Sequence, residues 1–204
     1  MTGLRQRKKE QTRQRIAAVA LRLFAERGFD AVTVNEIAEA AEVAKATLFA
    51  YFPTKESLVL HGAGDDDLAG VVVTGQAAGQ TFLAALRAHF RAFAAGRLSA
   101  ADLDAVLVRV RVIQDSPALR DSANALLYQQ RQALAQVLAD QYGPTAAALM
   151  AAQVAASLLT LQEAYFQRLS GGAGAEEAGQ ELARDVELAF DLLEHGLLKH
   201  AEGH

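Results

Sequence analysis

The stretch of residues 33–55 constrains the fold of this chain more than any other, because it has the pattern of two short helices joined by a tight turn. Thr33 and Glu36 have the spacing of a capping box, in which a hydroxyl and a carboxylate satisfy free backbone N–H groups at a helix start. Apolar residues at helical spacing follow, and residues 42–44 are expected to form the turn. The second helix is expected to end before Pro53, which has no backbone N–H.

The second helix, expected over residues 45–51, has two different faces. Leu48 and Phe52 lie four residues apart and are expected to face the interior of the domain. The side chains left on the other face are Lys45, Ala46, Thr47, Phe49 and Tyr51. Two short helices with a tight turn, the second bearing an outward polar face, suit the major groove of B-DNA. The pattern therefore predicts a DNA-binding helix-turn-helix.

A longer amphipathic helix is expected before this pair, over residues 11–27. Gly28 suits the left-handed conformation that ends a helix, and Phe29 is expected to fold back on that helix. The basic residues that precede and enter the helix are Arg5, Arg7, Lys8, Lys9, Arg13 and Arg15. Such an arm attracts phosphate without reading sequence, whereas for residues 1–8 a solvated, disordered terminus is the alternative.

Residues 10–60 resemble the N-terminal domain of the TetR family of bacterial one-component regulators. The resemblance rests on four parts in order: the join LFAERGFDAVTV, the helix IAEAA, the helix TLFAYF and a lysine two residues after a proline. It covers somewhat under a third of the chain. Together with the helical pattern of the remainder, it predicts an all-α fold. We expect a three-helix helix-turn-helix domain over residues 1–60 and a helical-bundle domain for ligand binding and dimerisation over residues 61–204.

The resemblance also implies roles for individual side chains at the DNA. Thr33 would hold a phosphate, and Asn35 would reach a base edge. The other implied contacts are Lys45, Ala46 and Thr47 to bases, Phe49 and Tyr51 to the sugar–phosphate wall, and Lys55 to a phosphate. For two of these residues there is an alternative explanation that does not involve DNA. Thr33 would serve only as a helix cap, and Phe49 would be a partly buried core residue.

The sequence departs from the family pattern at three positions of the second short helix. Ala46 stands where the family often has Gly or Pro, Phe49 replaces a common Tyr, and Ala50 is smaller than the usual aromatic residue. The ring of Phe49 remains able to pack on a thymine methyl group. These departures affect the operator sequence rather than the mode of docking.

Composition narrows the remaining possibilities. The chain has 204 residues, 51% of them hydrophobic, and no cysteine, which excludes a disulfide framework, a thiolate nucleophile and a cysteine metal site. Residues 1–60 carry a formal charge of +3 and the remainder −7, so attraction to DNA is concentrated at one end. Charged residues interrupt the apolar pattern after the basic arm, so we expect no signal peptide or membrane span and a cytoplasmic protein.

The remainder of the chain is expected to be helical. Residues 99–114 contain the alternating run VLVRVRVI, which is typical of a strand, but the spacing of Ser99 and Asp102 is that of a helix start and no partner strand is evident. Ser116 and Pro117 are expected to begin the following helix. The glycine-containing stretch 61–79 is either a frayed connecting helix or a loop. The expected helices are residues 80–95, 99–114, 117–141, 145–169 and 176–199.

The last two helices carry stripes for helix packing, which either bury within one subunit or form a dimer interface. The stripes are Met150, Val154, Leu158 and Leu161 on one helix and Leu182, Val186, Ala189, Leu193 and Gly196 on the other. In the family resembled, these two helices pair with their symmetry mates. A homodimer would also present two reading helices to successive major grooves of a palindrome.

The resemblance further implies an effector cavity inside the body. The candidate lining residues are Phe82, Leu86, Phe90, Val106, Arg109, Val110, Ile113, Leu127, Tyr128 and Tyr165. Plain core packing is the alternative for the apolar ones. Arg109 needs either a carboxylate partner, from Asp102, Asp104 or Asp115, or an anionic ligand. The segment SPALR and the Ala-rich body look similar to the TetR branch that takes acyl-CoA-like ligands, which suggests an apolar or acyl-type effector.

We therefore predict a repressor whose two conformations differ in operator affinity and are shifted by a small-molecule effector. No cofactor or metal is expected, and the chain is not expected to be an enzyme. The alternatives are an effector-independent architectural DNA-binding protein and a metal-dependent helical enzyme. The only metal-like group, Asp191, Glu194, His195, His200 and His204, fits a solvated tail better than a ligand set.

Overall fold

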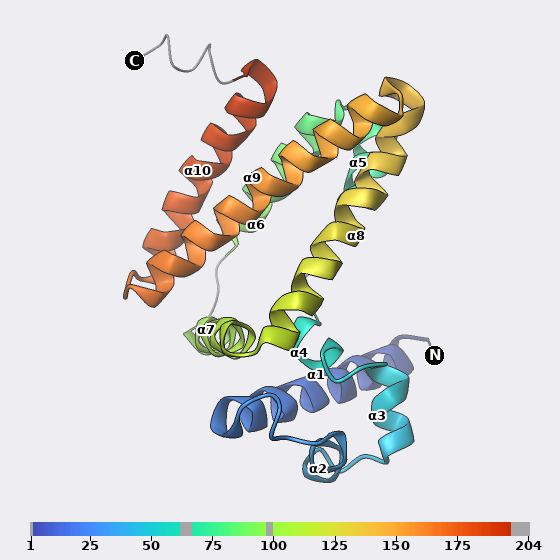
Figure 1. Ribbon diagram of the computed structural model, residues 1–204, viewed down its shortest axis with the longest axis vertical. Helices are drawn as coiled ribbons and strands as arrows, with labels where there is room; N and C mark the ends of the chain where they lie inside the picture. The colour runs from blue at the N-terminus through green and yellow to red at the C-terminus, as the bar shows by residue number, and fades with distance from the viewer. Residues whose placement is uncertain (1, 62–66, 97–99, 197–204) are drawn as a thin grey trace. The chain divides into compact units, whose positions relative to one another are not determined.

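The computed structural model describes residues 2–61, 67–96 and 100–196, and every regular element in these ranges is an α-helix (Figure 1). This confirms the predicted all-α class. The helices are α1 (Thr2–Arg27), α2 (Val34–Ala40), α3 (Lys45–Tyr51), α4 (Ser57–Leu60), α5 (Leu68–Ala77), α6 (Phe82–Ala95), α7 (Ala100–Asp115), α8 (Pro117–Tyr142), α9 (Pro144–Ser170) and α10 (Ala175–His195).

The chain divides into two compact units, and the first contains more than the N-terminal helices. It joins the residues up to 65 with residues 105–125, which belong to the second part of α7 and the first part of α8. Its core includes Phe24, Ile37 and Leu48 from the first three helices. Val112 from α7 and Leu119 from α8 are buried in the same cluster. Residues far along the chain therefore enlarge a core that the short N-terminal helices alone would leave small.

The second unit comprises residues 66–104 and 126–204, of which 67–96, 100–104 and 126–196 are described. Its packing is organised by α6, which lies against α5 and α10, while α10 also lies against α9. The rings of Phe90 and Phe190 stack between α6 and α10, with centroids 6.4 Å apart. A Cβ at Gly75 would lie 2.3 Å from the Cβ of Ala85, so α5 approaches α6 more closely than any larger residue would allow.

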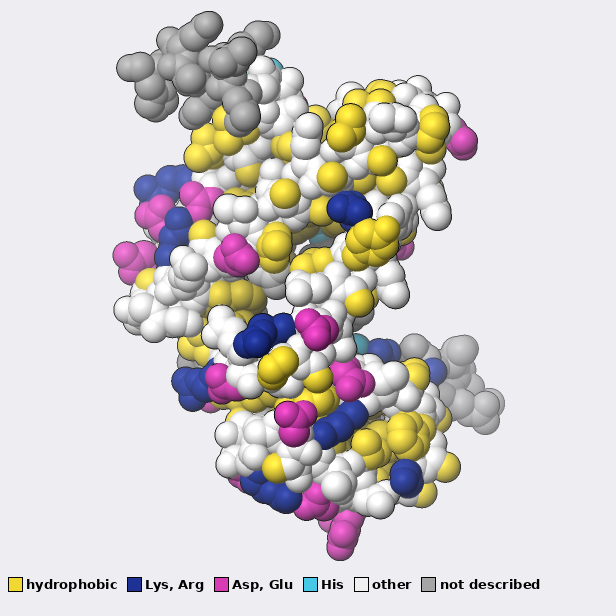
Figure 2. All heavy atoms as spheres, viewed as in Figure 1, with side chains coloured by type: hydrophobic (Ala, Val, Ile, Leu, Met, Phe, Trp, Pro, Cys, Tyr) yellow, Lys and Arg dark blue, Asp and Glu magenta, His cyan; other side chains and the backbone are white. Residues whose placement is uncertain are grey.

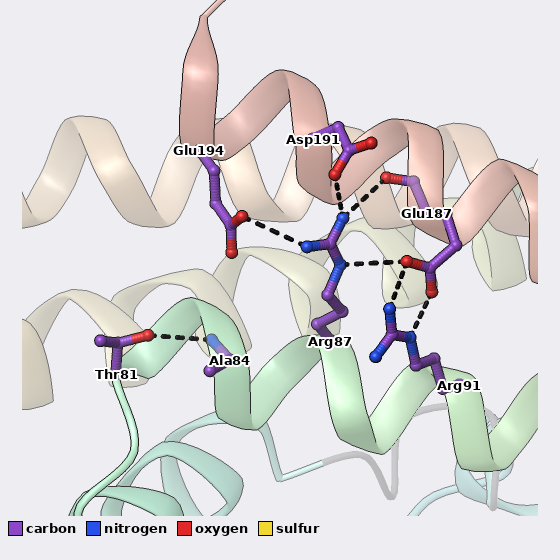
Figure 3. A network of polar contacts seen from close by, with 7 residues as sticks. All are labelled: Thr81, Ala84, Arg87, Arg91, Glu187, Asp191 and Glu194. Carbon is purple, nitrogen blue, oxygen red and sulfur yellow. Dashed lines mark hydrogen bonds and ion pairs between the residues drawn. The ribbon is translucent and has the colours of Figure 1, made fainter.

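An ion-pair network also joins α6 to α10 (Figure 3). Arg87 pairs with Asp191, with Glu194 at 3.2 Å and with Glu187 at 3.4 Å, and Arg91 pairs with Glu187. The hydrogen bond from Arg91, opposed in part by burial, lowers the pKa of Glu187, and the same bond raises the pKa of Arg91. Because several charges share one geometry, the network fixes the register of the two helices better than an isolated surface pair would.

Most predicted helices agree with the structure, and the main differences lie at two places. Helix α1 begins at Thr2 rather than near residue 11, so the basic arm is helical from residue 2 onward. In the glycine-containing stretch, α4 ends at Leu60 and α5 occupies Leu68–Ala77, while Gly62 and Gly64 lie outside the described residues. The alternating run of residues 106–113 is helical within α7, as expected.

Two predictions about helix ends can be compared directly with the geometry. Gly28 adopts a φ of +83° after α1, and the ring of Phe29 returns to that of Phe24 with centroids 5.0 Å apart. The hydroxyl of Ser116 accepts a hydrogen bond from the backbone N–H of Leu119 at 3.4 Å, at the start of α8. Both ends are therefore formed as their residues predict.

Helix α9 is long and apolar. An 18-residue window within it has a mean hydropathy of 1.5, and only 22% of that window is buried. By length and composition this helix could cross a membrane, although a single such helix is weak evidence because helices of soluble proteins meet the same criterion. Helices α5 and α6, if counted as one segment, are also long and apolar enough, but their axes are bent by 116° at the break between them.

Candidate nucleic-acid interface

The start of α2 is a complete capping box. The backbone N–H of Thr33 donates to the Glu36 carboxylate at 2.8 Å, and the backbone N–H of Glu36 donates to the Thr33 hydroxyl at 3.3 Å. The hydroxyl itself donates to Glu36 at 2.7 Å, and Arg27 pairs with Glu36 at 2.8 Å. These hydrogen bonds, first those from Thr33, lower the pKa of Glu36 from 4.5 to about 2. The hydroxyl hydrogen of Thr33 is therefore already engaged within the protein.

The turn between α2 and α3 is a Schellman motif. The backbone N–H of Val43 donates to Ala38 at 2.9 Å, and that of Glu42 donates to Glu39 at 3.0 Å. Glu42 is the residue between the helices with a left-handed conformation, with a φ of 53°, although it is not glycine. This conformation costs a residue with a Cβ on the order of 1 kcal/mol. The turn thus forms where the sequence predicts it, at the expense of local strain.

Helix α3 presents the two faces that its sequence predicts. Leu48 and Phe52 are buried, with 0% and 1% of their surface exposed. Four outward residues, Lys45, Ala46, Thr47 and Ala50, are exposed, as is Asn35 on α2. Phe49 is 40% exposed, with the Lys45 ammonium 6.0 Å from its ring centroid, whereas Tyr51 is half-buried against the core. Lys45, Ala46 and Thr47 therefore occupy the outward first turn of the helix.

Lys55 differs from the other predicted contacts because its ammonium already has a partner within the protein. Its Nζ donates to the backbone carbonyl of Phe29 at 2.5 Å. The same ammonium lies 4.3 Å from the ring centroid of Phe29 and 5.7 Å from that of Phe24. One N–H donor of the Lys55 ammonium is therefore used within the protein, beside two aromatic rings, and the phosphate contact of Lys55 stays a prediction.

The side chains of the basic arm that the structure describes, from Arg7 to Arg15, fall into two groups. Arg7, Lys8, Lys9 and Arg15 are exposed. Arg13 instead donates from Nη2 to Nδ1 of His61 at 2.9 Å, and its guanidinium lies 5.6 Å from the ring centroid of Phe52. The sequence pattern contained no sign of this role, because His61 is 48 residues away. Arg13 thus joins α1 to the end of α4, whereas the exposed group remains available to phosphate.

The ten candidate effector residues are divided between the two units. Phe82, Leu86 and Tyr165 are buried in the second unit, Phe90 and Leu127 are half-buried there, and Tyr128 is 54% exposed. Val106, Arg109, Val110 and Ile113 are half-buried and belong to the first unit. That all ten line one effector cavity stays a prediction.

Burial alters the ionisation of two of these residues. It lowers the pKa of the Arg109 guanidinium and raises the pKa of the Tyr165 hydroxyl. Desolvation is the whole cause of the Arg109 shift, and no described carboxylate contributes to it. Whether a carboxylate or an anionic ligand compensates the charge of Arg109 stays a prediction.

The acidic side chains near the end of α10 form ion pairs within the protein. Asp191, Glu194 and His195 bring potential ligand atoms within 4.8 Å of one another, and all three are exposed. Arg87 pairs with both carboxylates, so a cation is already present (Figure 3). His200 and His204 lie outside the described residues.

Comparison with known proteins assigns both parts of the chain. Residues 16–61 match the family model described as bacterial regulatory proteins, tetR family, and residues 80–198 match the MftR C-terminal domain. The chain is 36% identical over 125 residues to the HTH-type transcriptional regulator TcmR of Streptomyces glaucescens, covering 57% of this chain and 54% of that protein. It is 42% identical over 52 residues to the putative mycofactocin biosynthesis transcriptional regulator MftR of Mycobacterium tuberculosis, covering 26% of each. The chain thus spans about half or less of the curated relatives it matches.

A solved structure extends the similarity over nearly the whole chain. Thermus thermophilus FadR, a TetR-family transcriptional repressor solved in complex with lauroyl-CoA, is 28% identical with a TM-score of 0.52. The match covers 91% of this chain and 94% of that one. These relatives are transcriptional regulators, in agreement with the prediction that the chain is not an enzyme.

Proposed function

Because this chain belongs to the TetR family of bacterial regulatory proteins, we propose that it is a repressor that binds a palindromic operator as a homodimer and releases it on binding a small molecule. The observation that carries this proposal is the exposed face of α3. Its first turn presents Lys45, Ala46 and Thr47, while Leu48 and Phe52 anchor the opposite face in the core. A rigid helix with such a face enters the major groove.

The proposed contacts follow from what each side chain offers. Lys45 donates to guanine acceptors, the Thr47 hydroxyl donates or accepts, and the Phe49 ring packs on a thymine methyl. Asn35 is proposed to reach a base edge. The contacts proposed to the sugar–phosphate backbone are Thr33 and Tyr51, together with the exposed basic residues of α1. The Thr33 hydroxyl has one hydrogen, which it already donates to Glu36. A phosphate would have to share that hydrogen with Glu36, so we expect the phosphate contact of Thr33 to be weak.

Dimerisation is proposed through α9 and α10, but by a different stripe from the one the sequence suggested. Val154, Leu161, Leu182 and Val186 are buried within the chain. The outward stripe of α9 is instead Leu149, Ala152, Ala156 and Leu159, spaced by three and four residues, with Leu149 60% exposed and Leu159 37% exposed. In Figure 2 the face of α9 turned to the viewer carries few charged side chains. Small and apolar residues at this spacing support close packing against a second copy.

An acyl-type effector is the ligand class that the comparisons favour. The support is the similarity to FadR, whose structure holds lauroyl-CoA, together with the apolar candidates on α6. The division into a reading domain of residues 1–60 and an effector domain of residues 61–204 remains part of this proposal. Residues 105–125 belong to the effector domain in this division but pack within the first compact unit. We place the protein in the cytoplasm, where operator DNA and acyl-CoA molecules are both found.

The test is a binding titration of the purified protein with DNA from its own upstream region. We expect saturable binding to one short site and a lower affinity when lauroyl-CoA is added, with free CoA as the control. Binding without any site preference would refute the repressor. Selective binding that lauroyl-CoA leaves unchanged would refute only the acyl effector.

A further inference from the structure

We propose that Arg13 is a positioning residue, which joins the end of the reading helix α3 to the end of α4 and so couples the DNA-binding face to the parts of α7 and α8 that belong to the first unit. This inference rests on the proposed operator binding. It gives an internal role to a residue that the sequence pattern places in the basic arm, whatever its charge adds to the attraction of DNA.

The Arg13 guanidinium lies where three helices meet. From α1, its Nη2 donates to Nδ1 of His61, the residue that follows α4, at 2.9 Å. The same guanidinium lies 5.6 Å from the ring centroid of Phe52, the C-cap residue of α3. The rings of Phe52 and His61 meet edge to face, with centroids 5.5 Å apart. Arg13, Phe52 and His61 therefore form one joint between α1, α3 and α4.

The chemistry of the three side chains makes the arginine the polar link of this joint. A guanidinium has only N–H donors, so Nδ1 of His61 must accept and the imidazole carries a hydrogen on Nε2. Phe52 is 1% exposed, so its ring is a fixed part of the core. Within the described part of the chain, the buried Nε of Arg13 has no hydrogen-bond partner, which costs free energy. The bond to His61 and the contact with the Phe52 ring must therefore hold the guanidinium in place.

Helix α4 extends the joint to residues far along the chain. Its two buried residues, Leu58 and Val59, lie in the cluster that also holds Val112 of α7 and Leu119 of α8. A shift of α7 or α8 within this cluster is therefore expected to move α4, and the joint passes the movement to the end of α3. Because coupling between two sites is reciprocal, DNA held by α3 must in turn alter α4 and α7.

The first experiment measures backbone hydrogen exchange by mass spectrometry in the wild type, Arg13→Met and Arg15→Met, free and with saturating operator DNA. Arg15→Met is the matched control, because it removes the same charge from an exposed position of the same helix. We expect DNA to slow exchange in α3 of all three proteins. In the wild type and Arg15→Met, DNA should also change exchange in α4 and in residues 105–115 by about twofold or more, and in Arg13→Met this second response should be absent.

A second pair of variants tests the hydrogen bond itself and does not depend on the folding of Arg13→Met. His61→Asn keeps an acceptor oxygen close to the position of Nδ1, whereas His61→Leu removes the acceptor and keeps an apolar side chain. We expect His61→Asn to retain the response of α4 and residues 105–115 to operator DNA, and His61→Leu to lose it. A purely structural role would lower the melting temperature of His61→Leu without removing the response.

Three results would overturn the proposal. The response to DNA could persist in Arg13→Met or in His61→Leu, it could be lost equally in Arg15→Met, or operator binding could leave α4 and residues 105–115 of the wild type unchanged. All three leave operator binding itself intact. If the wild-type protein instead binds its operator no better than a scrambled duplex, the proposed function fails, and this inference fails with it.

Discussion

Thr33 and Glu36 exchange backbone and side-chain hydrogen bonds at the start of α2, with the Thr33 N–H 2.8 Å from the Glu36 carboxylate and the Glu36 N–H 3.3 Å from the Thr33 hydroxyl. Arg27, the last residue of α1, pairs with the same carboxylate. One acidic side chain therefore caps α2 and connects it to α1. Helix α3 follows α2 after a short turn, so the capping box helps to fix the position of α3 relative to α1.

The first prediction concerns pH. The folded-state pKa of Glu36 is about 2, below the ordinary value of 4.5, so ionised Glu36 stabilises the fold above about pH 4.5. This contribution is lost as the pH falls from about 4.5 towards 2. Glu36→Gln should therefore melt at a lower temperature than the wild type at pH 6, and the difference should shrink towards pH 2.5. Glu39→Gln, an exposed change on the same helix, is the control. A difference independent of pH would contradict the assignment.

The second prediction concerns the strained turn. Glu42 has a φ of 53°, which glycine adopts without steric cost. Glu42→Gly should raise the free energy of unfolding by about 1 kcal/mol, measured by urea denaturation. Ala40→Gly, two residues earlier and inside α2, should lower it by about the same amount. If both variants were destabilised equally, the left-handed turn would not be present in solution.

The third prediction tests the contribution of α8 to the core of the first unit. Leu119 is fully buried in the cluster that also holds Phe24 and Leu48. Leu119→Ala should cost about 2–4 kcal/mol of stability and should lower the hydrogen-exchange protection of α1 and α2. Val73→Ala, at a position 53% exposed on α5, is the control and should have a small effect on that protection. Loss of protection confined to α8 would argue against a shared core.

The fourth prediction concerns assembly. Leu149→Arg combined with Leu159→Arg places two charges on the outward stripe of α9 and should convert a dimer to a monomer in sedimentation equilibrium. Val73→Arg, at a position 53% exposed on α5, should leave the dimer intact. A double variant that remained dimeric would place the interface elsewhere.

Much of the fold follows from local patterns. The bounds of α3, the cap at Ser116 and the left-handed Gly28 depend on residues close in sequence, so the sequence predicts them well. The helical state of α7 was predicted against its alternating pattern, because no partner strand was evident.

The parts that the sequence does not reveal depend on contacts between distant residues. Arg13 looked like one member of a basic arm, but His61 and Phe52 give it partners within the domain. Lys55 fitted a family phosphate contact, and only the position of the Phe29 carbonyl shows an internal acceptor. The same holds for the α9 stripe, since a helix that is apolar on most sides does not indicate which side its own subunit covers.

The measurement that tests the central claim most directly is a footprint of the protein on its own upstream DNA, beside a Lys45→Ala, Tyr51→Ala double variant. We predict one protected region with two-fold symmetry, with half-sites about one helical turn apart or a multiple of it, which is lost in the double variant. Because Tyr51 packs against the core, circular dichroism of the double variant checks that its helices are still formed. Protection that is equal on every fragment and unchanged in the double variant would contradict the account, because only the basic residues of α1 would then be binding DNA.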